Sequence, residues 1–181
     1  MNHISIDCNS AIYEMTKYLV QEGHKKIIYV SDFEDRTSVE NDKISGYLKA
    51  VEDNELTFSK IYVVGGNKHN KAYELGKTLV KDAGEFTAVV CSSDEIAIGI
   101  MDSFIDNGIK VPEDVSIVGF GNIREGKFVR PELTTIGEPY YDVGAVGIRM
   151  LIKMIKGDKT QQGLMELPFT LEKRKSIKTL A

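Results

Sequence analysis

The sequence predicts an α/β fold built on a mostly parallel sheet, with helices on both faces of that sheet. Short apolar runs of four to six residues recur along the chain, and each is rich in β-branched or aromatic residues, as in strands buried on both faces. Segments with apolar residues at helical spacing alternate with these runs, which is the pattern of βαβ units. A chain of 181 residues is also long enough to bury a sizeable core.

The individual elements follow from this alternation. The central strands are predicted at residues 26–30, 61–64, 88–91 and 115–120. Helical stripes cover residues 11–19, 44–51, 72–83, 96–105 and 143–155, and glycines 23, 84, 108 and 157 stand where helices would stop. After residue 120 the alternation ends. We expect a loop at 121–132, a short strand at 133–136, and a final strand or hairpin at 164–173, broken by Pro168.

Composition excludes several classes of protein. The net charge of −4 disfavours nucleic-acid binding by this segment alone. No apolar run approaches the roughly 18 residues that span a bilayer, and the first residues do not resemble a signal peptide, so a cytoplasmic protein without membrane contact is expected. Cys8 and Cys91 are expected to be buried, inert thiols. The three histidines lack metal-ligand spacing, and His24 is expected to hydrogen-bond locally.

Catalytic and cofactor motifs are incomplete. Residues 121–128 nearly match a phosphate-binding P-loop after a strand, but Phe128 replaces the hydroxyl residue that would hold magnesium. A GxGxxG pattern starting at Gly119 fails because Arg124 occupies its third glycine. There is no GxSxG elbow. We therefore predict neither an enzyme nor a resident cofactor or metal.

Polar residues follow the predicted strands, at residues 31–33, 65–67, 92–94 and 121–122. Ligands of open α/β sheets bind beyond the carboxyl ends of strands, so these four loops predict a small-molecule crevice. Asp94 is expected to cap the following helix, whereas Asp32 and Asn122 could equally cap or bind. The basic cluster at 173–175 is expected to be a solvated tail.

Several segments carry a more specific similarity. They read DEIAIG at 94–99, GIKVPEDVSIVGF at 108–120 and PELTTI at 131–136. Two segments lie upstream of these, EGHKKI at 22–27 and Gly46-Tyr47. Two more lie near the end of the chain, Leu167-Pro168 and Arg174-Lys175-Ser176. In this order the chain resembles the lactose-repressor (LacI) family of bacterial transcription regulators over nearly its whole length.

The resemblance implies a periplasmic-binding-protein-like effector domain with two doubly wound lobes. It assigns residues 8–136 and 164–181 to a complete C-terminal effector-binding lobe, and residues 1–7 and 137–163 to remnants of a largely missing N-terminal lobe. The family's helix-turn-helix headpiece is not in this sequence, which indicates a fragment or a truncated gene product. The apolar stripe of the helix at 140–156 should then be displaced, swapped onto a partner chain, or laid on another apolar surface.

The resemblance also locates an effector site. The arginine of the family's R-x-x-G-Y segment is Lys43 here, its ligand-stacking aromatic aligns with Asn67, and the asparagine of its ND pair is Ser93. The aspartate of its GFD segment is Gly121, next to Asn122, and the glutamine after TTI is Glu138. Lys43, Ser93 and Asn122 are expected to face one crevice. The candidate effector-binding residues are Lys43, Asn67, Ser93, Asn122, Asp32, Phe33 and Glu138, with Asp32 or Phe33 at the edge.

These departures put a standard sugar or purine effector in doubt. Lys43 keeps a cation, while Gly121 removes a carboxylate, so an anionic or phosphorylated effector is favoured. A Glu138–Lys43 pair would cancel that preference, and a neutral ligand held by contacts elsewhere is the alternative.

Three functions compete at this point. The favoured one is the effector-sensing, dimerising part of a LacI-type repressor, in which a ligand closes two lobes and allosterically moves headpieces that bind operator DNA. A homodimer is expected. The alternative is a solute-binding protein of a sugar transport system with the same fold. An enzyme is disfavoured because no catalytic constellation supports it.

Overall fold

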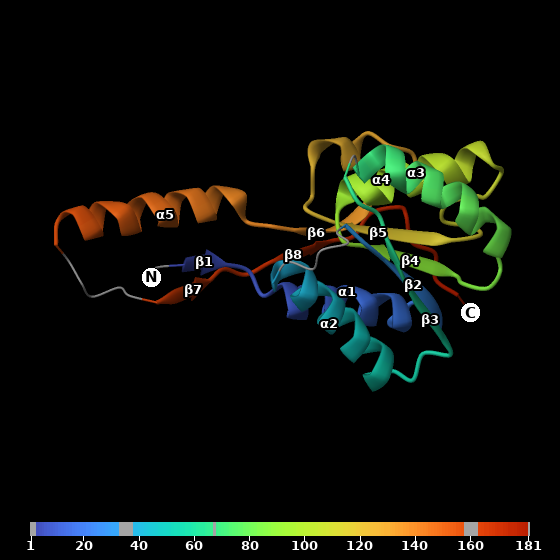
Figure 1. Cartoon of the computed structure of the whole chain (residues 1–181), viewed down its shortest axis with the longest axis horizontal. Helices are drawn as coiled ribbons and strands as arrows, with labels where there is room; N and C mark the ends of the chain where they lie inside the picture. Colours follow the sequence, from blue (N-terminus) through green and yellow to red (C-terminus); the bar gives the residue numbers. More distant parts are fainter. Residues whose placement is uncertain (1–2, 33–37, 67, 158–162, 181) are drawn as a thin grey trace.

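The computed structural model describes residues 3–32, 38–66, 68–157 and 163–180. Helices and strands alternate through most of the chain, as the sequence predicts (Figure 1). The elements are β1 (His3–Ser5), α1 (Cys8–Gln21), β2 (Lys26–Ser31), α2 (Ser38–Asp53), β3 (Phe58–Val63), α3 (Lys68–Leu79), η1 (Val80–Asp82), β4 (Ala88–Cys91), α4 (Asp94–Asp106), β5 (Ser116–Phe120), η2 (Arg124–Lys127), β6 (Thr134–Gly137), α5 (Tyr140–Ile155), β7 (Leu164–Glu166) and β8 (Thr170–Glu172).

A six-stranded sheet in the order β3-β2-β4-β5-β6-β8 forms the centre of the larger body. Its first five strands are parallel, and β8 pairs antiparallel with β6. The predicted α/β class with a parallel-dominated sheet is therefore confirmed. The expectation that the strand at 61–64 is buried on both faces is wrong, because β3 lies at the sheet edge and begins at Phe58.

Helices cover both faces of this sheet, with α1 and α2 on one face and α3 and α4 on the other (Figure 1). Side chains of β2 alternate between these faces: Ile27 and Tyr29 pack toward α1 and α2, whereas Ile28 and Val30 pack toward α3 and α4. Because every residue of a central strand meets a helix layer, both faces must be apolar. This explains the continuous apolar runs in the sequence.

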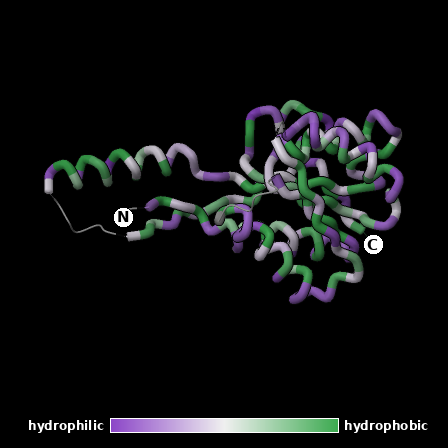
Figure 2. The backbone as a smooth tube through the Cα atoms, viewed as in Figure 1, coloured by the Kyte–Doolittle hydropathy of each residue, from purple (hydrophilic) through white to green (hydrophobic). Residues whose placement is uncertain are grey.

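A smaller body stands apart from the sheet and consists of β1, α5 and β7 (Figure 1). β1 and β7 form a separate two-stranded parallel sheet. Helix α5 carries exposed apolar side chains, among them Leu151, Ile152 and Ile155, and Figure 2 shows hydrophobic residues recurring along it. None of the helices in the described ranges is both long and apolar enough to cross a membrane.

The segment after residue 120 differs from the expectations in three respects. Residues 124–127 form the short 3-10 helix η2 inside the predicted loop. The final segment is not a hairpin, because β7 pairs with β1 and β8 pairs with β6 in another sheet. The chain therefore returns to the large sheet at residue 170, later than the boundary expected at residue 164.

The C-terminal segment is not a solvated tail. Arg174 Nη1 donates to the carbonyl oxygen of Leu133 at 2.7 Å, and the Ser176 hydroxyl donates to the carbonyl of Ile117 at 2.5 Å. His24 Nε2 lies 3.0 Å from the carbonyl oxygen of Lys178, so its contacts are distant in sequence rather than local. Lys173 and Lys175 are exposed, as a solvated tail predicts, but the prediction is wrong for Arg174, because it supplies a partner that a buried backbone carbonyl requires.

Candidate functional site

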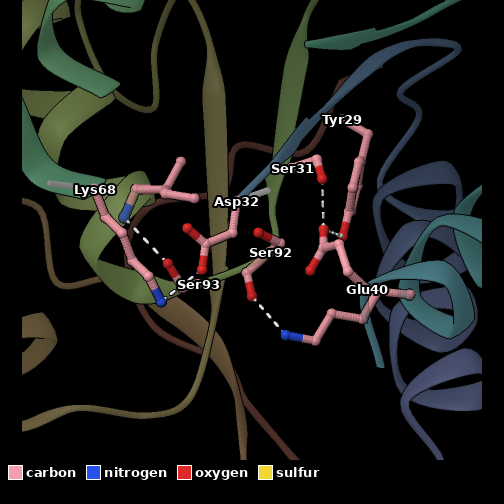
Figure 3. Close-up of polar contacts among 9 residues, drawn as sticks. Tyr29, Ser31, Asp32, Glu40, Lys68, Ser92 and Ser93 are labelled. Atoms are coloured by element: carbon pink, nitrogen blue, oxygen red, sulfur yellow. Dashed lines mark hydrogen bonds and ion pairs between the residues drawn. The ribbon is translucent and has the colours of Figure 1, made fainter. Parts of the chain in front are cut away.

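β2 and β4 are neighbours in the sheet, and the strand order reverses between them. β3 lies on one side of β2, and β4 with the following strands lies on the other. In open α/β sheets the carboxyl ends of such strands flank the ligand crevice. Here those ends are Ser31-Asp32 and Ser92-Ser93, and Figure 3 shows them side by side.

Lys43 reaches this edge from α2. Its Nζ donates to the carbonyl oxygen of Ser92 at 2.9 Å and lies 4.0 Å from the ring centroid of Phe120. Both of these partners are uncharged, and the Lys43 side chain is half-buried at the strand ends. Glycine at residue 46 lets α2 approach α1 closely, because a Cβ there would overlap the carbonyl of Asn9.

Asp32 forms an ion pair that the sequence did not predict. Its Oδ2 lies 2.6 Å from Lys68 Nζ, which comes from the first residue of α3 (Figure 3). Asp32 is only 5% exposed, and its Oδ1 has no hydrogen-bond partner in the described residues. Phe33 and Asn67 lie outside the described residues, so their predicted roles stay predictions.

Glu40 is a second buried carboxylate at this edge, and sequence reasoning missed it. Its Oε1 accepts hydrogen bonds from the Ser31 hydroxyl at 2.7 Å and the Tyr29 hydroxyl at 3.1 Å (Figure 3). Burial, followed by the nearby Glu40 charge, raises the pKa of Tyr29, so this phenol stays protonated as a donor. The signal available in the sequence was the i, i+3 spacing of Glu40 and Lys43 on one helix face.

Ser93, rather than Asp94, caps α4. The Ser93 hydroxyl accepts from the backbone N–H of Ile96 at 3.4 Å, which corrects the expected cap. Asp94 instead points into the fold, where it accepts from the Thr135 hydroxyl at 2.6 Å and the Ile123 N–H at 2.8 Å. Burial raises the pKa of Asp94, and these two hydrogen bonds oppose the rise. Its role is to hold η2 and β6 against α4.

Asn122 and Glu138 have recorded partners other than Lys43. Asn122 has φ +53 and its Oδ1 accepts a short hydrogen bond from Arg174. Glu138 accepts one from the Tyr140 hydroxyl. The described contacts thus join Lys43 to the end of β4, while the Asn122 amide is tied to the C-terminal segment. That these residues share one effector crevice stays a prediction.

Other features give little chemistry. The two cysteines are buried, and burial raises the pKa of the Cys8 thiol to about 11. In the part of the chain that the structure describes, no cluster of His, Cys, Asp or Glu could hold a metal ion. A groove of about 840 Å³ lies beside α3 and α4, and its described lining includes none of the predicted site residues. It is lined by Lys68, His69, Glu95, Ile98, Ile123, Glu125, Phe128 and Val129.

Comparison with known proteins identifies the family and agrees with the fold. The sequence profile of the family described as periplasmic binding protein-like domain matches residues 16–177. Catabolite control protein A of Priestia megaterium is 32% identical over 176 residues, 97% of this chain and 53% of that protein. The transcription regulator CcpA of Lactococcus lactis has a crystal structure with a TM-score of 0.86 at 30% identity, over 97% of this chain and 64% of that one.

A LacI family transcriptional regulator of Enterococcus faecium, crystallised with bound ribose, has a TM-score of 0.88 at 25% identity. The match covers 98% of this chain and 66% of that one. This chain spans about half the length of the curated relatives it matches.

Proposed function

Because the chain belongs to the LacI family of transcriptional regulators, with its periplasmic-binding-protein-like effector domain, we propose that it senses a small-molecule effector on behalf of a longer regulator. The relatives are regulators rather than enzymes, which supports a role in binding rather than catalysis. The alternative of a transport solute-binding protein has no support among them. A cytoplasmic location follows from this role.

The observation that carries the proposal is the charge at the carboxyl edge of the sheet. Lys43 presents an ammonium whose recorded partners are a carbonyl oxygen and an aromatic ring. A half-buried cation attracts an anion more strongly than an ammonium in water does. Among the described residues Glu138 accepts from Tyr140 and forms no ion pair with Lys43. The effector is therefore anionic or phosphorylated, and Lys43 and Ser93 contact it.

The two-body arrangement provides a route for allostery. The chain passes between the bodies three times, at residues 6–7, 138–139 and 167–169. A ligand at the carboxyl edge of the large sheet lies near these crossings, since β6 ends at Gly137. Closure around the ligand would change the angle between the bodies. In a homodimer of the longer protein, that movement would change the relative position of two separate headpieces and so their binding to operator DNA.

Calorimetry with ribose and ribose 5-phosphate tests the proposal. We expect the chain to bind ribose 5-phosphate more tightly, and Lys43→Met to reduce that affinity about tenfold or more while leaving ribose unaffected. Lys49→Met is the matched control, because Lys49 lies on the same helix over the Tyr13 ring at 5.3 Å. Tighter binding of ribose that is indifferent to Lys43→Met would contradict an anionic effector.

A further inference from the structure

Two buried oxygens at the ends of β2 and β4 lack hydrogen-bond partners. They are Oδ1 of Asp32 and Oγ of Ser92, each without a partner in the described residues. The two strands are adjacent, and the Ser92 N–H donates to the Val30 carbonyl at 2.9 Å, so these side chains follow neighbouring strands. Leaving a buried acceptor unpaired costs about 1–3 kcal/mol, and more for a charged group. The partner of such an oxygen is a bound water or a polar atom of a ligand.

Lys68 determines what kind of partner Asp32 can take. The ion pair at 2.6 Å engages Oδ2 and orients the carboxylate, as Figure 3 shows. Lys68 offsets the charge of Asp32, so the pair carries no net charge. Oδ1 of Asp32 is nevertheless a strong hydrogen-bond acceptor. A second cation at Oδ1 would be repelled by Lys68. A neutral O–H donor suits this oxygen best.

Lys43 supplies the complementary feature on the other side of Ser92. Its ammonium donates to the Ser92 carbonyl oxygen at 2.9 Å. The cation therefore lies close to Ser92, the residue whose hydroxyl has no partner in the described residues. The Asp32–Lys68 pair sums to zero charge, and Lys43 lies three residues along α2 from the buried Glu40 carboxylate, which accepts from the Tyr29 and Ser31 hydroxyls. The edge thus combines an anion-binding ammonium with a hydroxyl-binding carboxylate.

We infer that Asp32 is a specificity-determining residue that accepts a hydrogen bond from a hydroxyl of the effector, while Lys43 takes the effector's anionic group. The ligand class is a polyhydroxylated anion, such as a sugar phosphate or a sugar acid. The inference rests on the proposed function, because it needs an effector at this edge of the sheet.

The test compares two phosphates that differ in their hydroxyls. Ribose 5-phosphate offers several O–H donors, and n-pentyl phosphate offers the same anionic group without them. The chain should bind ribose 5-phosphate at least tenfold more tightly. Asp32→Asn keeps the side chain's size but weakens the acceptor. Because it also releases the Lys68 charge, which acts on both phosphates alike, the readout is the ratio of the two affinities, and the preference for ribose 5-phosphate over n-pentyl phosphate should fall about tenfold. Asp102→Asn is the control, since Asp102 on α4 lies 3.0 Å from His69 of α3 and contacts none of the proposed site residues in the described structure.

The outcomes separate the inference from the proposed function. An unchanged ratio of ribose 5-phosphate to n-pentyl phosphate affinity in Asp32→Asn overturns the role of Asp32 and leaves an anionic effector standing. Binding of neither phosphate by the unmodified chain overturns both. If Asp32→Asn loses both ligands because the site is disrupted, the unmodified chain decides: equal affinities for the two phosphates overturn the inference, and a tenfold preference for ribose 5-phosphate supports it.

Discussion

The Asp94 carboxylate occupies the space that a side chain at Gly119 would need, because an ideal Cβ on Gly119 would overlap Asp94 Oδ1. Asp94 is almost completely buried and binds Thr135 and Ile123, so it has little room to move. The VGF sequence of β5 therefore needs glycine for packing, since its φ is not in the left-handed region.

Gly119→Ala should destabilise the fold by about 1–3 kcal/mol, because the added methyl group overpacks the site and displaces Asp94 from its hydrogen bonds. Urea unfolding measures this change. Gly144→Ala is the control, since a Cβ at that helical position meets no atom within 4 Å. Equal stability of the two variants would contradict the steric argument.

Stability should fall as the pH drops from 7.5 to 5.5 because of His24. Burial lowers the pKa of His24 from its ordinary 6.5, so the unfolded chain takes up a proton more readily than the folded one. This contribution is fully present above pH 6.5 and is lost as the pH falls toward the folded pKa. The urea midpoint of His24→Gln should change less with pH across this range than the midpoint of the unmodified chain.

His69→Gln is the control for this measurement, since the His69 side chain is 46% exposed and contacts Asp102 on the surface. Its urea midpoints should follow those of the unmodified chain at each pH. A slope in His24→Gln as steep as in the unmodified chain would show that other groups cause the dependence.

Arg174→Met should cost about 1.5–3 kcal/mol, because it removes charged hydrogen bonds to the Leu133 carbonyl and to Asn122. Lys175→Met should cost at most about 1 kcal/mol, since the Lys175 side chain is 72% exposed in its pair with Glu132. Chemical denaturation of both variants checks the difference. If Arg174→Met cost no more than Lys175→Met, the C-terminal segment would not be anchored as described.

Substituting one isoleucine in each body should show how much each body contributes to the free energy of unfolding. Ile12→Ala should cost about 2–5 kcal/mol, because Ile12 is fully buried between α1 and the sheet. Ile155→Ala should change stability by no more than about 0.5 kcal/mol, because Ile155 is 77% exposed on α5. Thermal or urea unfolding of this chain provides the comparison, and a large loss in Ile155→Ala would show that α5 is covered in solution.

The strands and helices of the large sheet could be predicted closely from the sequence. Runs such as Lys26-Ile27-Ile28-Tyr29-Val30 have apolar residues on both sides of the strand, and only a strand covered by helices on both faces can bury them all. The prediction was weaker at β3, because this edge strand is half exposed and the polar residues Ser59 and Lys60 separate Phe58 from the apolar run that follows. The family resemblance placed Lys43 and Ser93 at the carboxyl edge of the same sheet, where the structure has them.

The sequence by itself therefore determined the order of the elements and the parallel class of the sheet. The reason is that the spacing of apolar residues within one segment indicates whether that segment is a helix or a buried strand. Only the tertiary structure decided which charged and polar groups meet. Asp32 pairs with Lys68, His24 with the Lys178 carbonyl, and Arg174 with Asn122. These partners are 36 to 154 positions apart. Their meeting depends on strand order and on the path of the C-terminal segment, and no spacing within one element encodes either.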